Sequence, residues 1–174
     1  ISSMYAALGR CLFEATDAQE AVKVIRDLKD KLRARVPSLD EVKALFPNIV
    51  YTENLTKQRK LVKYILAGLL KAQKPSIALD YEPMTIEHLV PQSMIGTGKF
   101  TEATIGQVGN LILVTEGLNK KLKDKPFKEK KKILPDDVYK LPKEVSAVTD
   151  WTDADIIGRT QKIAEQAYNS IWKI

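Results

Sequence analysis

Four polar residues near the middle of the 174-residue chain have the types and spacing of a hydrolytic site. Glu87 and His88 are adjacent, and His88 is the only histidine in the sequence. Asn110 and Asn119 follow, one on either side of a short apolar run. A neutral imidazole can take a proton from water near neutral pH, and carboxylate and amide oxygens bind hard divalent cations. Together these groups predict a metal-assisted attack of water on a phosphate ester.

A strand, a second strand and a helix would bring these residues together. A short strand over 84–87 leads into His88, and the apolar run 111–114 has the length of a buried strand. Helical spacing of leucines resumes after Thr115, a suitable N-cap residue. We therefore expect His88 at the end of the first strand, with the two asparagines before the second strand and on the helix.

The rest of the chain is predicted to be helical, which gives a mainly α fold with a small β-hairpin. Apolar periodicity and capping residues predict helices over 4–15, 17–36, 39–46, 57–70, 118–134 with a break at Pro126, and 152–172. Residues 93–109 are rich in glycine and show no clear helical period, so we expect turns there. Arg159, in the last helix, either binds phosphate or braces Asp153 and Asp155.

The charge balance favours an anionic partner. Lysine and arginine exceed aspartate and glutamate by 28 − 22 = 6, and eight lysines lie between Lys120 and Lys132. Such a run is a solvated helix face in many proteins, but this one begins beside Asn119. We expect Lys120, Lys123 and Lys130 to contact the phosphate backbone of a nucleic acid, which is a salt-sensitive and sequence-independent interaction.

Composition also indicates the cellular environment to expect for the protein. No stretch approaches the ~20 apolar residues of a membrane span, so we expect no membrane contact. The single cysteine, Cys11, cannot form an internal disulfide, which is typical of a reducing cytoplasm. The chain starts at Ile1 without a charged leader, and we expect it to be part of a longer protein.

The central residues resemble the His-Asn-Asn form of the HNH nuclease motif, whose fold is the ββα-metal (His-Me finger) core. More narrowly, the chain resembles the C-terminal nuclease domain of GmrSD-type modification-dependent restriction endonucleases. The same domain type occurs in phage-defence nickases that sense phosphorothioated DNA. The resemblance spans roughly Lys57 to Trp172. It is carried by TIEHLVPQ (85–92), GNLIL (109–113), residues 118–119, Phe127 with Lys130, and Trp151, Ile156, Arg159 and Trp172.

The resemblance implies a role for each central residue. His88 would be the general base, and Glu87 and Asn119 would bind the metal. Asn110, expected with His88 among the catalytic residues, would either orient the histidine or brace the loop, and a simple turn cap is the alternative. The site would be rich in oxygen ligands, which favours Mg²⁺ or Mn²⁺ over Zn²⁺. Gln92 would shape the loop and touch the nucleic acid.

The family further implies a metal-dependent DNA endonuclease, nicking or cleaving, as the effector of a bacterial cytoplasmic restriction or anti-phage protein. An N-terminal sensor/NTPase domain would be its partner. We expect a helical segment over 1–55 and the nuclease domain over 56–174, with the ββα core at 84–134 and a C-terminal helix at 152–172. Two alternatives are an HNH nuclease that acts on RNA and a non-catalytic nucleic-acid-binding module.

Overall fold

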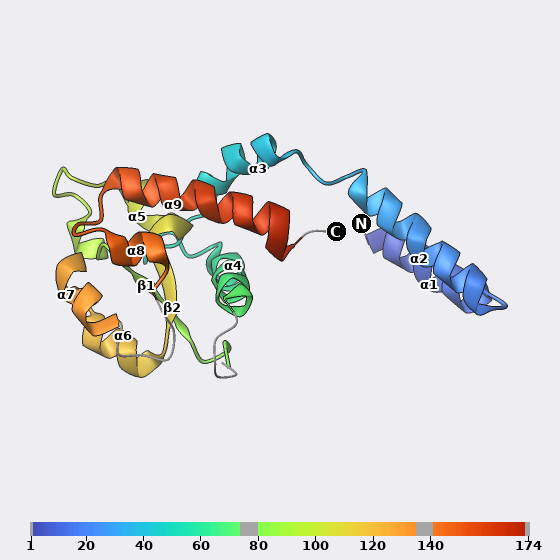
Figure 1. Ribbon diagram of the computed structural model, residues 1–174, viewed down its shortest axis with the longest axis horizontal. Helices are drawn as coiled ribbons and strands as arrows, with labels where there is room; N and C mark the ends of the chain where they lie inside the picture. The colour runs from blue at the N-terminus through green and yellow to red at the C-terminus, as the bar shows by residue number, and fades with distance from the viewer. Residues whose placement is uncertain (1, 74–79, 135–140, 173–174) are drawn as a thin grey trace. The chain divides into compact units, whose positions relative to one another are not determined.

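A computed structural model describes residues 2–73, 80–134 and 141–172 (Figure 1). The chain divides into two compact units, one ending at Ser38 and the other beginning at Leu39. The second unit therefore includes residues 39–55, which the sequence analysis had placed outside the nuclease domain. Within the described ranges, none of the helices has the length and hydrophobicity that crossing a membrane would require.

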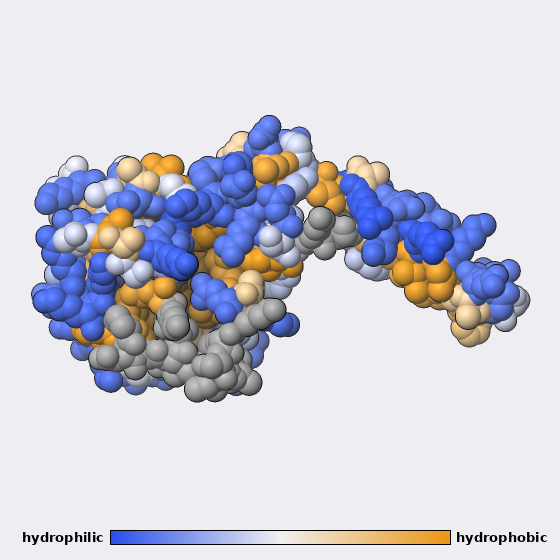
Figure 2. Space-filling view, viewed as in Figure 1, coloured by the Kyte–Doolittle hydropathy of each residue, from blue (hydrophilic) through white to orange (hydrophobic). Residues whose placement is uncertain are grey.

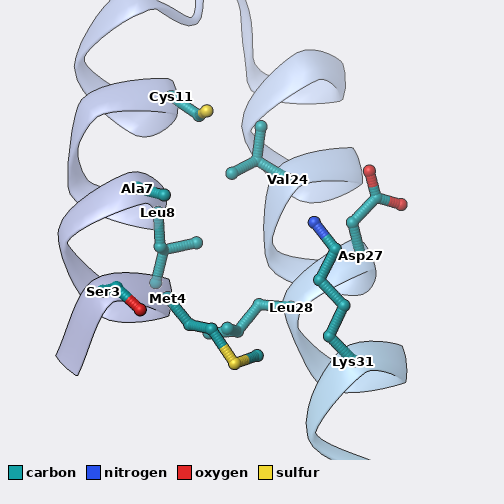
Figure 3. Close-up of a pocket in the computed structure, with 9 residues that line it drawn as sticks. All are labelled: Ser3, Met4, Ala7, Leu8, Cys11, Val24, Asp27, Leu28 and Lys31. Carbon is teal, nitrogen blue, oxygen red and sulfur yellow. The ribbon is translucent and has the colours of Figure 1, made fainter. Parts of the chain in front are cut away.

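The first unit is a pair of helices, α1 (Ser2–Glu14) and α2 (Ala18–Arg33). Asp17 caps α2 as predicted, because its side chain accepts from the backbone N–H groups of Gln19 and Glu20. Leu8 of α1 and Leu28 of α2 point into the space between the helices (Figure 3). No described residue of either helix is buried, and hydrophobic side chains remain visible on their surface (Figure 2).

The second unit carries the hydrophobic core and all the residues of the predicted site. Its helical elements are α3 (Leu39–Leu45), η1 (Phe46–Asn48), α4 (Arg59–Ala72), η2 (Gln92–Met94), α5 (Glu102–Gly106), η3 (Val108–Asn110), α6 (Glu116–Leu122), α7 (Phe127–Ile133), α8 (Lys143–Ala147), α9 (Asp153–Gln166) and the π-helical turn η5 (Ala167–Ile171). The described part of the chain is thus mainly helical, as expected.

A two-stranded antiparallel sheet lies at the centre of this unit. Strand β1 (Thr85–His88) pairs with β2 (Leu111–Val114), and the register places His88 opposite Leu111. Helix α4 packs on β2 through its buried apolar stripe, and α6 packs on β1 (Figure 1). The predicted order of strand, strand and helix is confirmed.

The loop between the two strands is more helical than the sequence suggested. Residues 92–110 contain η2, α5 and η3, whereas turns were expected over 93–109. Helix α5 has five residues, which is too short for an apolar period to show in the sequence. Thr101 caps it by accepting from Thr104 N–H, and the isolated bridge between Val50 and Gln107 ties its end to the segment that precedes α4.

Helix α9 packs against the short turn η3, which immediately precedes β2. Thr152 and Asp155 form a capping box at the start of α9, so the helix begins where the sequence predicted. It ends at Gln166 and continues as η5. A Cβ on Gly109 would overlap the carbonyl oxygen of Ile156, so only glycine permits this close approach.

Candidate active site

A pocket of about 260 Å³ opens beside the end of β1. It is lined by residues from β1, the loop that follows it, α6, α7 and the extended segment 50–53. Six of the eight predicted site residues line this pocket: Glu87, His88, Gln92, Asn119, Lys123 and Lys130. The structure thus brings together side chains that are up to 43 residues apart in sequence.

His88 is buried at the end of β1, and one ring nitrogen has a defined partner. Its Nε2 lies 2.9 Å from the main-chain carbonyl oxygen of Tyr51. Because a carbonyl oxygen only accepts hydrogen bonds, Nε2 carries the proton and Nδ1 is the unprotonated nitrogen. Burial lowers the pKa of His88 to about 4, a shift that the Tyr51 carbonyl opposes and the Lys130 charge reinforces. The imidazole is therefore neutral at pH 7, with Nδ1 able to accept a proton.

The segment that supplies the Tyr51 carbonyl is held at several points. Tyr51 N–H donates to the carbonyl of Gly106 at 2.8 Å. Glu53 N–H donates to Oε1 of Gln92 at 2.7 Å, which joins the segment to the loop after β1. Gln92 thus shapes the loop through its carbonyl oxygen, and its contact with nucleic acid stays a prediction.

Glu87 is buried beside His88 and forms an ion pair with Lys130. Nζ of Lys130 lies 2.5 Å from Oε1 of Glu87 and 2.6 Å from the carbonyl oxygen of His88. Burial raises the pKa of the Glu87 carboxyl, and the Lys130 ammonium opposes that rise. Lys130 is fully buried, so the prediction that it contacts DNA phosphate is wrong. It lies inside the site as the counter-charge of Glu87.

Asn119 lies on α6 with a defined orientation of its amide. Its Nδ2 donates to Oγ1 of Thr85 at 2.8 Å, and the Thr85 hydroxyl donates to the carbonyl of Val114. The hydroxyl proton is therefore used elsewhere, and Thr85 must accept from Asn119. This leaves Oδ1 of Asn119 as the acceptor atom that this residue contributes to the pocket.

Asn110 is fully buried and does not line the pocket. Its Oδ1 accepts from Val90 N–H at 2.8 Å, and its Nδ2 donates to the carbonyls of Val90 and Ile105 at 3.0 and 2.9 Å. These bonds hold the loop that follows His88. The structure thus favours the bracing alternative, and it corrects the assignment of Asn110 as a residue that orients the imidazole directly.

Arg159 fixes the peptide groups on either side of Asn110. Its Nη1 donates to the carbonyls of Gly109 and Leu111 at 2.7 and 3.0 Å. Thr160 adds a hydroxyl that accepts from Gly109 N–H at 3.1 Å. Its Nε also lies 3.7 Å from Oε1 of Glu144, so Arg159 pairs with an acidic residue other than the predicted Asp153 and Asp155.

Two exposed lysines, Lys120 in α6 and Lys123 directly after it, differ in their relation to the pocket. Lys123 lines the pocket and has a backbone φ of 40°, a conformation that residues other than glycine rarely adopt. Lys120 lies outside the lining and pairs with Glu116 at 2.7 Å. Of the predicted phosphate contacts, Lys123 alone combines exposure with a place on the pocket wall.

Five lining residues were not among the predicted site residues: Tyr51, Glu53, Ile86, Pro91 and Asp124. Asp124 is one of two acidic residues within the lysine run, and that exception was the available signal. Its negative charge contributes to raising the pKa of Glu87. Tyr51 contributes a main-chain oxygen, for which no residue type is diagnostic.

The donor atoms fit a hard cation held by few protein ligands. Glu87 contributes a carboxylate and Asn119 an amide carbonyl to the same pocket. Among the described side chains, no group of three His, Cys, Asp or Glu residues is arranged to hold a metal ion. Mg²⁺ commonly keeps several waters and binds through one or two carboxylates, whereas structural Zn²⁺ sites take four nitrogen or sulfur ligands. The set therefore suits Mg²⁺ or Mn²⁺.

Comparison with known families gives a match over most of the chain. The family model described as GmrSD restriction endonucleases, C-terminal domain, matches residues 36–166. This range contains both strands, helices α3 to α9 and the pocket-lining residues, including the Tyr51 segment. No curated protein and no solved structure matches the chain.

Proposed function

The chain belongs to the family of C-terminal domains of GmrSD restriction endonucleases, and from this premise we propose that it hydrolyses phosphodiester bonds of DNA at the His88 pocket. The observation that carries the proposal is the hydrogen bond from His88 Nε2 to the Tyr51 carbonyl, which leaves Nδ1 as a base. The hairpin followed by α6 supports a ββα-metal core of the HNH type, because it places Glu87, His88 and Asn119 around one pocket.

In this proposal, His88 activates the attacking water. Nδ1 takes a proton from the water while the water oxygen forms a bond to phosphorus and the bond from phosphorus to the 3′ oxygen breaks. The leaving oxygen takes a proton from solvent, and the products are a 5′-phosphate and a 3′-hydroxyl. A negative phosphate near the imidazole would oppose the lowering of the His88 pKa that burial causes in the free protein.

Glu87 and Asn119 are the residues that would hold a divalent cation, Mg²⁺ or Mn²⁺. When bound, the cation would stabilise the negative charge that develops on the phosphate and on the leaving oxygen. Lys130 occupies Oε1 of Glu87, so the second carboxylate oxygen is the expected ligand atom. The Thr85 hydroxyl orients the amide of Asn119 so that its carbonyl oxygen is available.

Lys123 and the net charge of +6 supply contacts to the phosphate backbone. DNA is proposed as the substrate on the strength of the family. The remaining parts of the proposal also rest on the family: an effector domain of a bacterial cytoplasmic restriction or anti-phage protein, with target sensing in an N-terminal sensor/NTPase domain.

The test is cleavage of supercoiled plasmid in Mg²⁺, Mn²⁺ or EDTA. We expect the wild type to convert plasmid to open circles or linear DNA only with metal. His88→Ala should abolish conversion while retaining a gel shift, and Lys162→Ala, an exposed change on α9, should cleave normally. Wild-type binding without cleavage under any metal would favour the binding module. Cleavage of matched RNA but not of DNA would favour the RNA nuclease.

A further inference from the structure

Lys130 connects the side chain of Glu87 to the main chain of His88 from a separate helix, α7. We propose that Lys130 is a positioning residue that orients the Glu87 carboxylate for the divalent cation and acts on hydrolysis through Glu87. Its catalytic consequence rests on the function proposed above. Its consequence for cation binding does not require cleavage and can be measured separately.

Helix α7 is anchored well enough to hold an ammonium in place. The ring of Phe127, at the start of α7, stacks on Trp151 with centroids 5.5 Å apart. Nζ of Lys131 donates to the carbonyl of Val148 at 2.6 Å. Lys130 therefore extends from a helix that is fixed on both sides of it, and its ammonium has a defined position relative to β1.

The environment of Lys130 differs from that of its neighbours on the same helix. Lys128 is exposed and pairs with Asp150 at 3.3 Å, which is an ordinary surface ion pair. Lys130 is fully buried, and its partner Glu87 is nearly so. Burying an ammonium requires compensating partners, and an apolar side chain of similar volume often stabilises a fold as well or better. A lysine at this position is therefore poorly explained by packing alone.

The two contacts of Lys130 restrict the two adjacent residues that carry the proposed chemistry. One oxygen of Glu87 is bound to the ammonium, so the carboxylate presents its other oxygen in a fixed direction. The carbonyl of His88 is bound to the same nitrogen, which fixes the peptide that carries the imidazole. Residues that orient a metal ligand typically change metal affinity or activity by about 10–100-fold when removed.

The experiment is a double-mutant cycle in the full chain with Lys130→Met, Glu87→Gln and both changes together. Mn²⁺ alone is the probe for cation binding, followed by calorimetry. Plasmid cleavage at saturating Mn²⁺ is the second readout. Lys128→Met is the matched control, because it removes the same charge from the same helix outside the pocket.

We expect Lys130→Met to weaken Mn²⁺ binding and to lower kcat, each by at least about tenfold, with little change in KM for plasmid. In the Glu87→Gln background, the same substitution should change both quantities by less than about twofold, because its effect passes through Glu87. Lys128→Met should leave Mn²⁺ affinity unchanged. Equal losses in both backgrounds would overturn the inference, as would unchanged Mn²⁺ affinity in Lys130→Met or a wild type that binds no Mn²⁺.

The binding cycle separates this inference from the proposed function. A wild type that binds Mn²⁺ with the expected coupling but never cleaves would refute the nuclease and retain the role of Lys130 at the cation site. Circular dichroism and gel filtration check that each variant folds. If Lys130→Met does not fold, Lys130→Gln, which keeps donors for both acceptors, goes through the same cycle. If neither Lys130→Met nor Lys130→Gln folds, with or without Glu87→Gln, then Lys130 is needed for stability and the positioning role is wrong.

Discussion

Nε2 of His88 lies 2.9 Å from the main-chain carbonyl oxygen of Tyr51, a residue 37 positions earlier in the chain. The two rings also stack, with centroids 6.0 Å apart. This pairing determines which nitrogen carries the proton and thereby which nitrogen can accept one. The tautomer of the only histidine in the sequence thus depends on a segment outside the hairpin.

The first prediction concerns the pH dependence of stability without divalent cations. The pKa of His88 falls from 6.5 to about 4 on folding, so the unfolded chain binds the proton more tightly. Stability from this residue is therefore complete above pH 6.5 and is lost as the pH falls toward 4, by about 3 kcal/mol in total. Urea unfolding in EDTA at a series of pH values measures the loss. His88→Gln should reduce the slope of unfolding free energy against pH between pH 6.5 and 4. An unchanged slope would contradict the lowered pKa of His88.

The second prediction separates Asn110 from His88. Asn110→Ala removes three buried hydrogen bonds and leaves the Val90 peptide without its partners, so we expect a loss of about 2–4 kcal/mol in unfolding free energy. His88→Ala should abolish cleavage with a much smaller loss of stability. Denaturant titration beside the plasmid assay compares the two variants. Loss of cleavage in Asn110→Ala at unchanged stability would show that Asn110 acts in the reaction instead.

The third prediction uses two glycines in different surroundings. Gly109→Ala places a Cβ against the Ile156 carbonyl and the Thr160 backbone, so α9 must move away from η3. We expect a loss of at least about 2 kcal/mol, measured as a lower midpoint of thermal unfolding. Gly117→Ala is the control, since nothing lies within 4 Å of its Cβ position. Similar midpoints for the two variants would contradict the close packing at Gly109.

The fourth prediction concerns Lys123. Lys123→Ala and Lys123→Gly should weaken DNA binding equally and reduce the slope of log affinity against log salt by about 1, because each removes one phosphate contact. Lys123→Gly should be the more stable of the two by about 1 kcal/mol, since glycine accepts the backbone φ of 40°. Filter binding at several salt concentrations and thermal unfolding test the two parts. An unchanged slope of log affinity against log salt would show that Lys123 does not contact the DNA phosphates.

The local elements around the site could be predicted because their signals are local. The apolar run 111–114 and the N-cap at Thr115 determine β2 and α6 through burial and hydrogen bonding of near neighbours. A hairpin followed by a helix then brings Glu87, His88 and Asn119 to one pocket. The five-residue helix α5 could not be predicted, since it spans little more than one helical turn and its apolar residues have no room to repeat with a helical period.

The sequence by itself determined the residue types of the candidate site and their order along the hairpin and helix. Only the tertiary structure decided that Lys130 turns inward to Glu87. The other lysines of α7 are the same residue type and differ from Lys130 only in the side of the helix that they occupy. It also decided that the carbonyl of Tyr51 accepts the hydrogen bond from His88. Every residue has a main-chain carbonyl, and only long-range packing selects which one lies beside the imidazole.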